Sequence, residues 1–374
     1  MIVAGRVYDA EQSFFSKNIY GIFVVGKGRD LQRGKMRKLR YDYCALSNNH
    51  MLIFLDDKCL ISIDTGELKC EFVDYYDVAD NKSICPKGNM CSWGDSIVWL
   101  GVNGRVLYSW NVYEDYLEKR EISFFQNNAD VNNLIVQGER LFAFSSMCDG
   151  LYEFVPTKNI FEKIAEIEIG EVVSWTVDGD IIVLFMKDGY NLIYPDMRIE
   201  KYDIGEKYCI VRGIYDDEII ALTVDGIVLR GKLGDQLEEV ATLEDGPASQ
   251  MIKVGENVIF FPWKGHSIFL MSLINNSFKE LFINGEYEYV KSNYYKYNFY
   301  CEDEKYIWMS NRLGENPIRV DKVDFSIEKL NYEFPSINSE KEYFEKHDLF
   351  LWNEGEYMNL NDFCQICISN KEMF

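Results

Sequence analysis

Histidine and proline are scarce in this chain of 374 residues, which has 3 histidines and 7 prolines. A metal site of three imidazoles would need His50, His266 and His347 to converge, so we expect no metal centre of that kind. No stretch rich in proline, glycine or serine marks a linker between domains. We therefore expect one domain over residues 1–333, followed by a tail of different character over residues 334–374.

Long apolar runs and positive charge are also lacking. No run reaches the length of a membrane span, and the sequence shows no basic segment followed by an apolar signal core. The formal net charge of −22 disfavours binding to nucleic acid and to anionic membranes. Ten cysteines without a secretory signal are typical of a reducing compartment. These features predict a cytoplasmic protein that binds neither nucleic acid nor membrane.

Motifs of catalysis and cofactor binding are scarce as well. Cys364 and Cys367 form a Cys-x-x-Cys pair without a second pair for zinc, and we interpret them as packing groups of a terminal helix, with a redox pair as the alternative. The segment from Gly28 to Lys35 has one residue too many for a P-loop and lacks its Ser or Thr. Acidic turns such as residues 56–57 lack the alternating pattern of a calcium loop. We expect no cofactor.

One segment reverses the overall charge. Residues 27–40 hold seven basic residues and one acidic residue, a charge of +6, so the rest of the chain carries −28. We interpret this segment as a hairpin extension and outer strand that offsets the acidic body or docks an acidic partner. A local contact with an anion or a nucleic acid is the alternative.

What the chain does contain is a repeat of two apolar segments joined by a tight turn. The turns fall at residues 57, 104, 150, 189, 226, 265 and 314, which are 37 to 49 residues apart. In the clearest unit, apolar residues at 219–222 and 227–229 flank Asp225 and Gly226. Such a pair predicts a hairpin, because glycine adopts positive φ at little cost. A short strand precedes each hairpin and a more polar strand follows it, which gives four strands per unit.

Four-stranded units at this period resemble the blades of the β-propeller superfamily in architecture, over most of the chain. No Trp-Asp, kelch or quinoprotein motif recurs, so the resemblance names no particular family. A further unit at residues 13–25 and 35–40 raises the count to eight blades, with seven blades as the alternative. A strand at 348–352 is expected to close the ring, and a short helix at 359–367 to end the chain. The resemblance implies an all-β disc with a central channel and faces built from loops.

Aromatic residues are abundant, with 25 Tyr, 24 Phe and 7 Trp. Most should pack between blades, but exposed Tyr and Trp anchor partners well. Several tyrosines lie in the longest gap between turns, and long insertions in repeat proteins usually form functional loops. The expected binding residues are Trp263, His266, Tyr287, Tyr289, Tyr294, Tyr295, Tyr297 and Trp308. Trp93, Trp175 and Tyr215 are further candidates to line a face or the channel.

We interpret the chain as a monomeric module that binds a protein or peptide, because its repeats build a scaffold and its catalytic motifs are few. The alternative is an enzyme of the lyase, hydrolase or cyclotransferase type with a site in the central channel. A weaker alternative is carbohydrate recognition by stacked aromatic rings. Buried carboxylates, a histidine or a metal in the channel would favour the enzyme, since the fold itself does not choose between functions.

Overall fold

The chain divides into two compact units, residues 40–333 and residues 1–39 together with 334–374. The structure is a computed structural model. It describes residues 31–32, 41–55, 59–75, 84, 86–101, 104–114, 116–124, 131–145, 150–166, 172–186, 189–203, 209–215, 217–243, 248–263, 267–281, 297, 299–310, 317–330 and 357–358.

Residues 40–333 form seven sheets, each of four consecutive antiparallel strands. We call each sheet a blade and number its strands from the first, which is innermost, to the fourth, which is outermost. Blade 1 consists of β2 (Tyr41–Ser47), β3 (His50–Leu55), β4 (Cys59–Asp64) and β5 (Cys70–Tyr75). Blade 2 consists of β6 (Pro86–Trp93), β7 (Ser96–Gly101), β8 (Val106–Asn111) and β9 (Tyr116–Glu121). Blade 3 consists of β11 (Asn133–Gln137), β12 (Arg140–Phe144), β13 (Gly150–Val155) and β14 (Ile160–Glu166). Blades 4 and 5 are β15 (Val172–Asp178), β16 (Ile181–Met186), β17 (Gly189–Ile193) and β18 (Ile199–Asp203); and β19 (Cys209–Tyr215), β20 (Glu218–Thr223), β21 (Ile227–Lys232) and β22 (Glu238–Thr242). Blades 6 and 7 are β23 (Ala248–Val254), β24 (Asn257–Pro262), β25 (Ile268–Ser272) and β26 (Phe278–Leu281); and β27 (Tyr300–Glu302), β28 (Tyr306–Met309), β29 (Ile318–Asp321) and β30 (Ile327–Lys329). A short strand, β10 (Ser123–Phe124), adds a fifth, parallel member beside β14.

The turns that the sequence predicts all join the second strand of a blade to its third. Asp225 and Gly226, for example, connect β20 to β21, and Gly226 has a φ of 81°. The second strands are buried almost throughout because a neighbouring blade covers each of their faces; β7, β16, β20 and β24 are each intermediate at the first residue and buried at the next five. The outer strand β9 is partly or fully exposed along its length. This gradient of burial explains why the predicted hairpins are the most apolar part of each repeat.

The core lies between adjacent blades rather than at one centre. Phe144 of blade 3 meets Trp175 of blade 4 edge to face, with ring centroids 5.3 Å apart. Ile259 of blade 6 and Ile307 of blade 7 belong to one apolar cluster that joins the last two blades. Large flat side chains therefore fill the wedges between twisted sheets, as the abundance of aromatic residues predicts.

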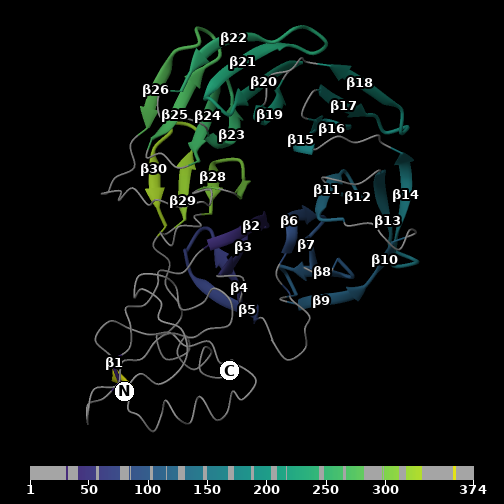
Figure 1. Cartoon of the computed structure of the whole chain (residues 1–374). Coiled ribbons are helices and arrows are strands. Elements are labelled where there is room, and N and C mark those ends of the chain that lie inside the picture. Colours follow the sequence, from purple (N-terminus) through teal and green to yellow (C-terminus); the bar gives the residue numbers. More distant parts are fainter. Residues whose placement is uncertain are drawn as a thin grey trace. The chain divides into compact units, whose positions relative to one another are not determined.

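The blades follow one another around a closed ring (Figure 1). The innermost strand β2 of blade 1 contacts β6 of blade 2 on one side and β27 of blade 7 on the other. The fold is thus a β-propeller of seven blades, as the alternative count predicts, and the count of eight is corrected. Blades 1 and 7 each hold four strands of their own, so seven units complete the ring.

The other unit has one described pair of strands. There β1 (Leu31–Gln32) pairs antiparallel with β31 (Tyr357–Met358). The expected hairpin at 13–25, outer strand at 35–40, closing strand at 348–352 and terminal helix at 359–367 lie outside the described residues, as do Cys364 and Cys367. Of the basic stretch 27–40, only Leu31 and Gln32 are described. The described residues contain no helix long and apolar enough to cross a membrane.

Candidate binding face and central cavity

The innermost strands of all seven blades surround a central cavity of about 530 Å³. Pockets of this size are typical of small-molecule sites. Its apolar wall includes Trp175 and Phe299. Its polar wall is made of amide, hydroxyl and guanidinium groups from residues Asn89, Asn133, Ser174, Thr176, Arg212, Tyr215, Ser249, Gln250 and Tyr300.

Several of these polar side chains bond to the main chain of the neighbouring blade. The Asn89 amide donates to the Leu134 carbonyl at 2.9 Å and accepts from the Leu134 N–H at 2.7 Å, which joins β6 to β11. The Ser174 hydroxyl donates to the Arg212 carbonyl at 3.1 Å, which joins β15 to β19. Such bonds extend the hydrogen bonding of one inner strand onto the next. The polar lining therefore links blade 2 to blade 3 and blade 4 to blade 5.

Arg212 is the cation of the described cavity wall. Its residue is 3% exposed. One guanidinium nitrogen, Nη1, donates to the carbonyls of Met186 and Gly189 at 2.5 and 3.1 Å, beside the turn between β16 and β17. These two bonds join blade 5 to blade 4. They also offset the free-energy cost of removing the guanidinium charge from water.

The described wall offers hydrogen-bond donors and aromatic faces. None of its described residues is Asp, Glu or His, and no described group of three or more His, Cys, Asp or Glu residues has the arrangement of a metal site. Burial, with smaller effects of Tyr300 and Glu302, raises the pKa of Tyr215 well above its usual range. Burial and Glu302 raise the pKa of Tyr300 to about 12. Both phenols therefore stay protonated near neutral pH.

One face of the propeller is formed by the turns between first and second strands (the first turns) and between third and fourth strands (the third turns). We call it the turn face. The Leu273 N–H, in the third turn of blade 6, donates to the Glu256 carbonyl of the first turn at 2.9 Å. The same bond joins Lys322 to Lys305 in blade 7, also at 2.9 Å. The two kinds of turn therefore lie together.

The first turns carry a recurring acidic residue. In blades 2, 3, 4 and 6 it follows a glycine with positive φ, such as Gly94 at 58° or Gly255 at 57°. These exposed carboxylates, one in each blade from 2 to 7, belong to Asp95, Glu139, Asp180, Asp217, Glu256 and Glu304. Sequence reasoning considered the acidic turns at 216–218 and 302–304 only as calcium loops and did not recognise a series, although its Gly-Asp and Gly-Glu pairs follow the period of the blades. The turn face is acidic around the inner part of the ring.

The third turns carry exposed apolar side chains. Tyr113, Ile274 and Val323 are 71%, 74% and 83% exposed, and each lies in the third turn of its blade. Their N–H groups donate to side-chain oxygens of Asn111, Ser272 and Asp321, respectively, two residues earlier. These caps fix the turn without burying the apolar residue. Three blades therefore expose an apolar group at the same position.

A groove of about 540 Å³ lies on the turn face between blades 5 and 6. Its described lining consists of Tyr215, Glu218, Arg230, Lys253, Gly255, Glu256, Leu273 and Ile274. Arg230 donates to the Glu218 carboxylate through Nε at 3.0 Å and Nη2 at 2.6 Å. The Arg230 Nη1 atom reaches across to the Leu273 carbonyl, so the same guanidinium links the two blades.

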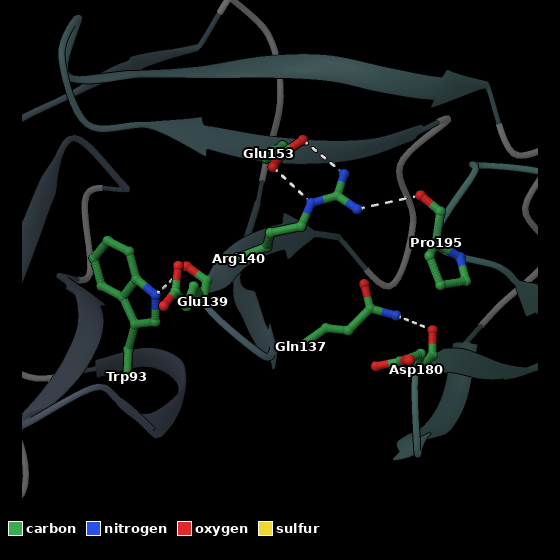
Figure 2. Close-up of polar contacts among 7 residues, drawn as sticks. All are labelled: Trp93, Gln137, Glu139, Arg140, Glu153, Asp180 and Pro195. Carbon is green, nitrogen blue, oxygen red and sulfur yellow. Dashed lines mark hydrogen bonds and ion pairs between the residues drawn. The ribbon is translucent and has the colours of Figure 1, made fainter.

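Polar bonds also join blades 2, 3 and 4 near the turn face (Figure 2). The Trp93 indole N–H donates to the Glu139 carbonyl at 2.8 Å, and the Gln137 amide donates to the Asp180 carbonyl. Arg140 donates to the carboxylate of Glu153 in its own blade and to a carbonyl in the third turn of blade 4. These bonds fix the first turns relative to one another, so the face is preorganised.

Three of the residues expected to bind a partner are described. Tyr297 is buried and its ring meets that of Phe261 edge to face, with centroids 5.9 Å apart. Trp308 is buried in a second strand and donates to the Asp303 carboxylate at 2.8 Å. Trp263 is half-buried just after β24. His266, Tyr287, Tyr289, Tyr294 and Tyr295 lie outside the described residues. Two described aromatic rings of the expected set are therefore core groups.

Other residues singled out in the sequence have clear places. Trp175 and Tyr215 line the central cavity, as expected of aromatic residues on the inner strands. The Nδ1 atom of His50 lies 3.3 Å from the Ser62 hydroxyl, and its ring meets that of Trp110 edge to face. His50 thus belongs to the interface between blades 1 and 2.

No family model matches the sequence, and no curated protein matches it closely enough to count as a relative. Solved structures do resemble the fold. PorZ, an essential bacterial surface component of the type-IX secretion system of Porphyromonas gingivalis, aligns with a TM-score of 0.55 at 11% identity. The alignment covers 80% of this chain and 39% of PorZ, so the chain spans well under half of that protein.

Two further structures resemble the chain at a similar level. A catalytically inactive virginiamycin B lyase from Staphylococcus aureus with quinupristin aligns with a TM-score of 0.53 at 11% identity, over 76% of this chain and 96% of that one. KlHsv2 with a loop replaced by a Gly-Ser linker gives 0.50 at 11% identity, over 75% and 91%. The chain is a β-propeller by architecture. At such low identity the likeness concerns the fold alone.

Proposed function

We propose that this protein is a binding module that recognises a protein or peptide through the turn face. The observation that carries the proposal is the distribution of exposed apolar groups. Five large apolar side chains are exposed among the described residues. Tyr113, Ile274 and Val323 lie in third turns, Tyr116 begins the strand after one, and the fifth, Tyr300, lines the central cavity. Exposed apolar and aromatic groups gathered on one face are typical of interaction surfaces.

The chemistry of the cavity supports binding over catalysis. Asn89, Ser174 and Arg212 bond to the main chain of neighbouring blades, which leaves them in structural roles. General acid–base catalysis uses side chains whose pKa lies near the working pH. The phenols of Tyr215 and Tyr300 have pKa values far above that range.

A small ligand in the central cavity is a second candidate, in line with an enzyme or carbohydrate-binding role. The observation in its favour is that three aromatic residues, Trp175, Tyr215 and Tyr300, line the central cavity of about 530 Å³. Aromatic faces bind flat or sugar-like apolar surfaces. A screen of metabolites and glycans by thermal shift would support this role if a ligand stabilised the wild type but not a Trp175→Ala variant.

We also propose that the protein works as a monomer in the cytoplasm. Four described cysteines, Cys44, Cys91, Cys209 and Cys301, are free thiols, which suits a reducing compartment. Light scattering coupled to gel filtration measures the mass in solution. Fractionation of cells that express the tagged chain tests its location.

The binding function is tested by panning a random phage-displayed peptide library against the purified full chain. We expect enrichment of a peptide family, and loss of that enrichment with the Tyr113→Ser, Ile274→Ser, Val323→Ser triple variant. Because all three side chains are exposed, the triple variant should fold as the wild type does. Failure of every peptide to enrich on the wild type would contradict the proposal.

A further inference from the structure

We propose that the groove between blades 5 and 6 anchors a peptide segment of another protein that carries a lysine or arginine beside a large apolar residue. This inference rests on the proposed function, because it names the partner chemistry of the same turn face. The groove is lined by strand residues of blade 5 on either side of its first turn, and by the first and third turns of blade 6.

The groove has an apolar wall that is open to solvent. Leu273 and Ile274 form this wall, and Ile274 is 74% exposed. Tyr215 adds an aromatic surface, which its hydroxyl fixes by donating to the Met251 carbonyl at 3.3 Å. Burying an isoleucine and an aromatic face against a partner's apolar side chain is favourable, as at the anchors of other interfaces.

An exposed carboxylate in the groove favours a cationic occupant. Arg230 is held by the Glu218 carboxylate, and the Lys253 ammonium lies 5.9 Å from the centroid of the Tyr215 ring. Glu256 is exposed, and no described residue binds its carboxylate. The charges of the lining balance, with Arg230 and Lys253 against Glu218 and Glu256, so the preference for a cation comes from this exposed carboxylate and from the chain's net charge of −22. A cation from a partner would gain both this contact and favourable long-range attraction.

The Glu256 carboxylate and the apolar Ile274 side chain are placed so that one basic residue of a partner can contact both. Glu256 and Ile274 line the same groove, and the main chain joins their turns through the bond from the Leu273 N–H to the Glu256 carbonyl at 2.9 Å. Lysine and arginine place methylene groups along apolar surface while the charged head stays polar. The stem of such a residue can therefore lie on Ile274 while its head reaches Glu256.

The groove is also rigid before a partner arrives. Arg230 bonds to the Leu273 carbonyl and, at 3.2 Å, to the Asn276 side chain. These bonds hold the third turn of blade 6 against blade 5. A preformed groove lowers the ordering cost of binding, because fewer side chains and loops must be immobilised.

The probe is a synthetic peptide with the most enriched sequence from panning against the wild-type chain, labelled for fluorescence anisotropy. The groove variants are Ile274→Asp and Glu256→Lys. Their controls are Thr242→Asp and Glu121→Lys, which change exposed residues at the last positions of the outer strands β22 and β9, away from the turn face. We expect the peptide to contain a basic residue beside a large apolar one. Each groove variant should weaken binding about tenfold or more, roughly 1.4 kcal/mol, and each control by less than about threefold.

A charge swap sharpens the test. Replacing the basic residue of the peptide with glutamate should abolish binding to the wild type and restore it to the Glu256→Lys variant. Circular dichroism and thermal melts of all variants verify that exposed substitutions leave the fold intact. If the peptide binds but neither groove variant weakens it, or if the enriched peptides are acidic, the inference is overturned while the binding function stands. If no peptide enriches on the wild type, the binding function itself fails.

Discussion

Arg140 of β12 and Glu153 of β13 form an ion pair with two hydrogen bonds, and Arg140 also bonds to the next blade. Nε lies 2.8 Å from Oε1 and Nη2 lies 2.9 Å from Oε2, and Nη1 donates to the Pro195 carbonyl of blade 4 at 3.3 Å (Figure 2). Blade 5 repeats this device with the strands exchanged, because Glu218 comes from the second strand and Arg230 from the third. In both cases a carboxylate orients an arginine toward the third turn of the following blade.

The first prediction concerns the bonds of Arg140. Arg140→Ala should lower the free energy of unfolding by about 1–2 kcal/mol, because it removes a bidentate pair, a bond between blades and the stacking of the guanidinium on Phe142. The control is Arg120→Ala, which breaks one bond to Glu118 on the outer strand β9 and should cost under about 1 kcal/mol. Urea denaturation measures both. Equal losses of unfolding free energy in the two variants would contradict a stabilising role of the Arg140 bond between blades.

The second prediction concerns the bridge between inner strands. Asn89→Ala leaves both the N–H and the carbonyl of Leu134 without their side-chain partner, so we expect a loss of about 1–3 kcal/mol. Asn275→Ala removes bonds within an exposed turn and should cost less than about 1 kcal/mol. Thermal unfolding compares the two variants. A smaller shift for Asn89→Ala than for Asn275→Ala would contradict the structural role of the cavity wall.

The third prediction uses the close approach of blades 2 and 3. A Cβ atom on Gly88 would lie 1.6 Å from the Asn132 carbonyl oxygen, so Gly88→Ala requires the main chain to move. We expect a loss of roughly 3 kcal/mol or more, the upper part of the range for overpacking. Gly94→Ala meets no atom within 4 Å, but its φ of 58° strains an alanine and should cost about 1 kcal/mol. If Gly88→Ala proves as stable as Gly94→Ala, the inner strands do not approach as described.

The fourth prediction is a loss of stability in alkali. Burial raises the pKa of Cys91 from 9.0 to about 12, so the native thiol keeps its proton where the unfolded thiol loses it. The raised pKa gives a contribution that is complete below about pH 9 and falls as pH rises toward 12. The urea midpoint should therefore fall between pH 8 and pH 10.5. In the Cys91→Ala variant the slope should be smaller by up to about 1.4 kcal/mol per pH unit. An unchanged slope would mean that the thiol is solvated.

The hairpins of the blades could be predicted because the turn residues and the apolar strands beside them agree with the final structure. Hairpins such as the one around Gly226 combine a turn residue with two apolar strands, and both signals are local. The count of eight blades was one too high because the segment at 13–25 follows the same local pattern, whereas the alternative count of seven is confirmed. Whether such a segment enters the ring depends on long-range packing: β2 meets β27, and those two strands are far apart in the sequence.

The site was harder to predict for a related reason. Tyr297 and Trp308 are expected near turns, where exposure is common, yet both are buried: Tyr297 packs in the cluster that joins blades 6 and 7, and Trp308 lies within β28. Exposure at Ile274 follows from the cap that Ser272 provides, which composition does not reveal. The acidic first turns could have been found from Gly-acid pairs such as Gly94-Asp95, but their flanking residues are less apolar than those of the hairpins.

The closed ring, on which the turn face and the groove depend, is tested most directly at its seam. The Cys301 thiol of β27 lies within hydrogen-bonding reach of the Cys44 thiol of β2. Diamide accepts two electrons and two protons from such a pair as the disulfide forms, and the reaction is run at about pH 8.5 because burial raises the pKa of Cys301. Peptide mapping by mass spectrometry of the folded, oxidised monomer should identify a Cys44–Cys301 disulfide as the main product, absent from a Cys44→Ser variant. Disulfides that join Cys44 to other cysteines, with Cys301 unlinked, would contradict a ring in which the first and last blades meet.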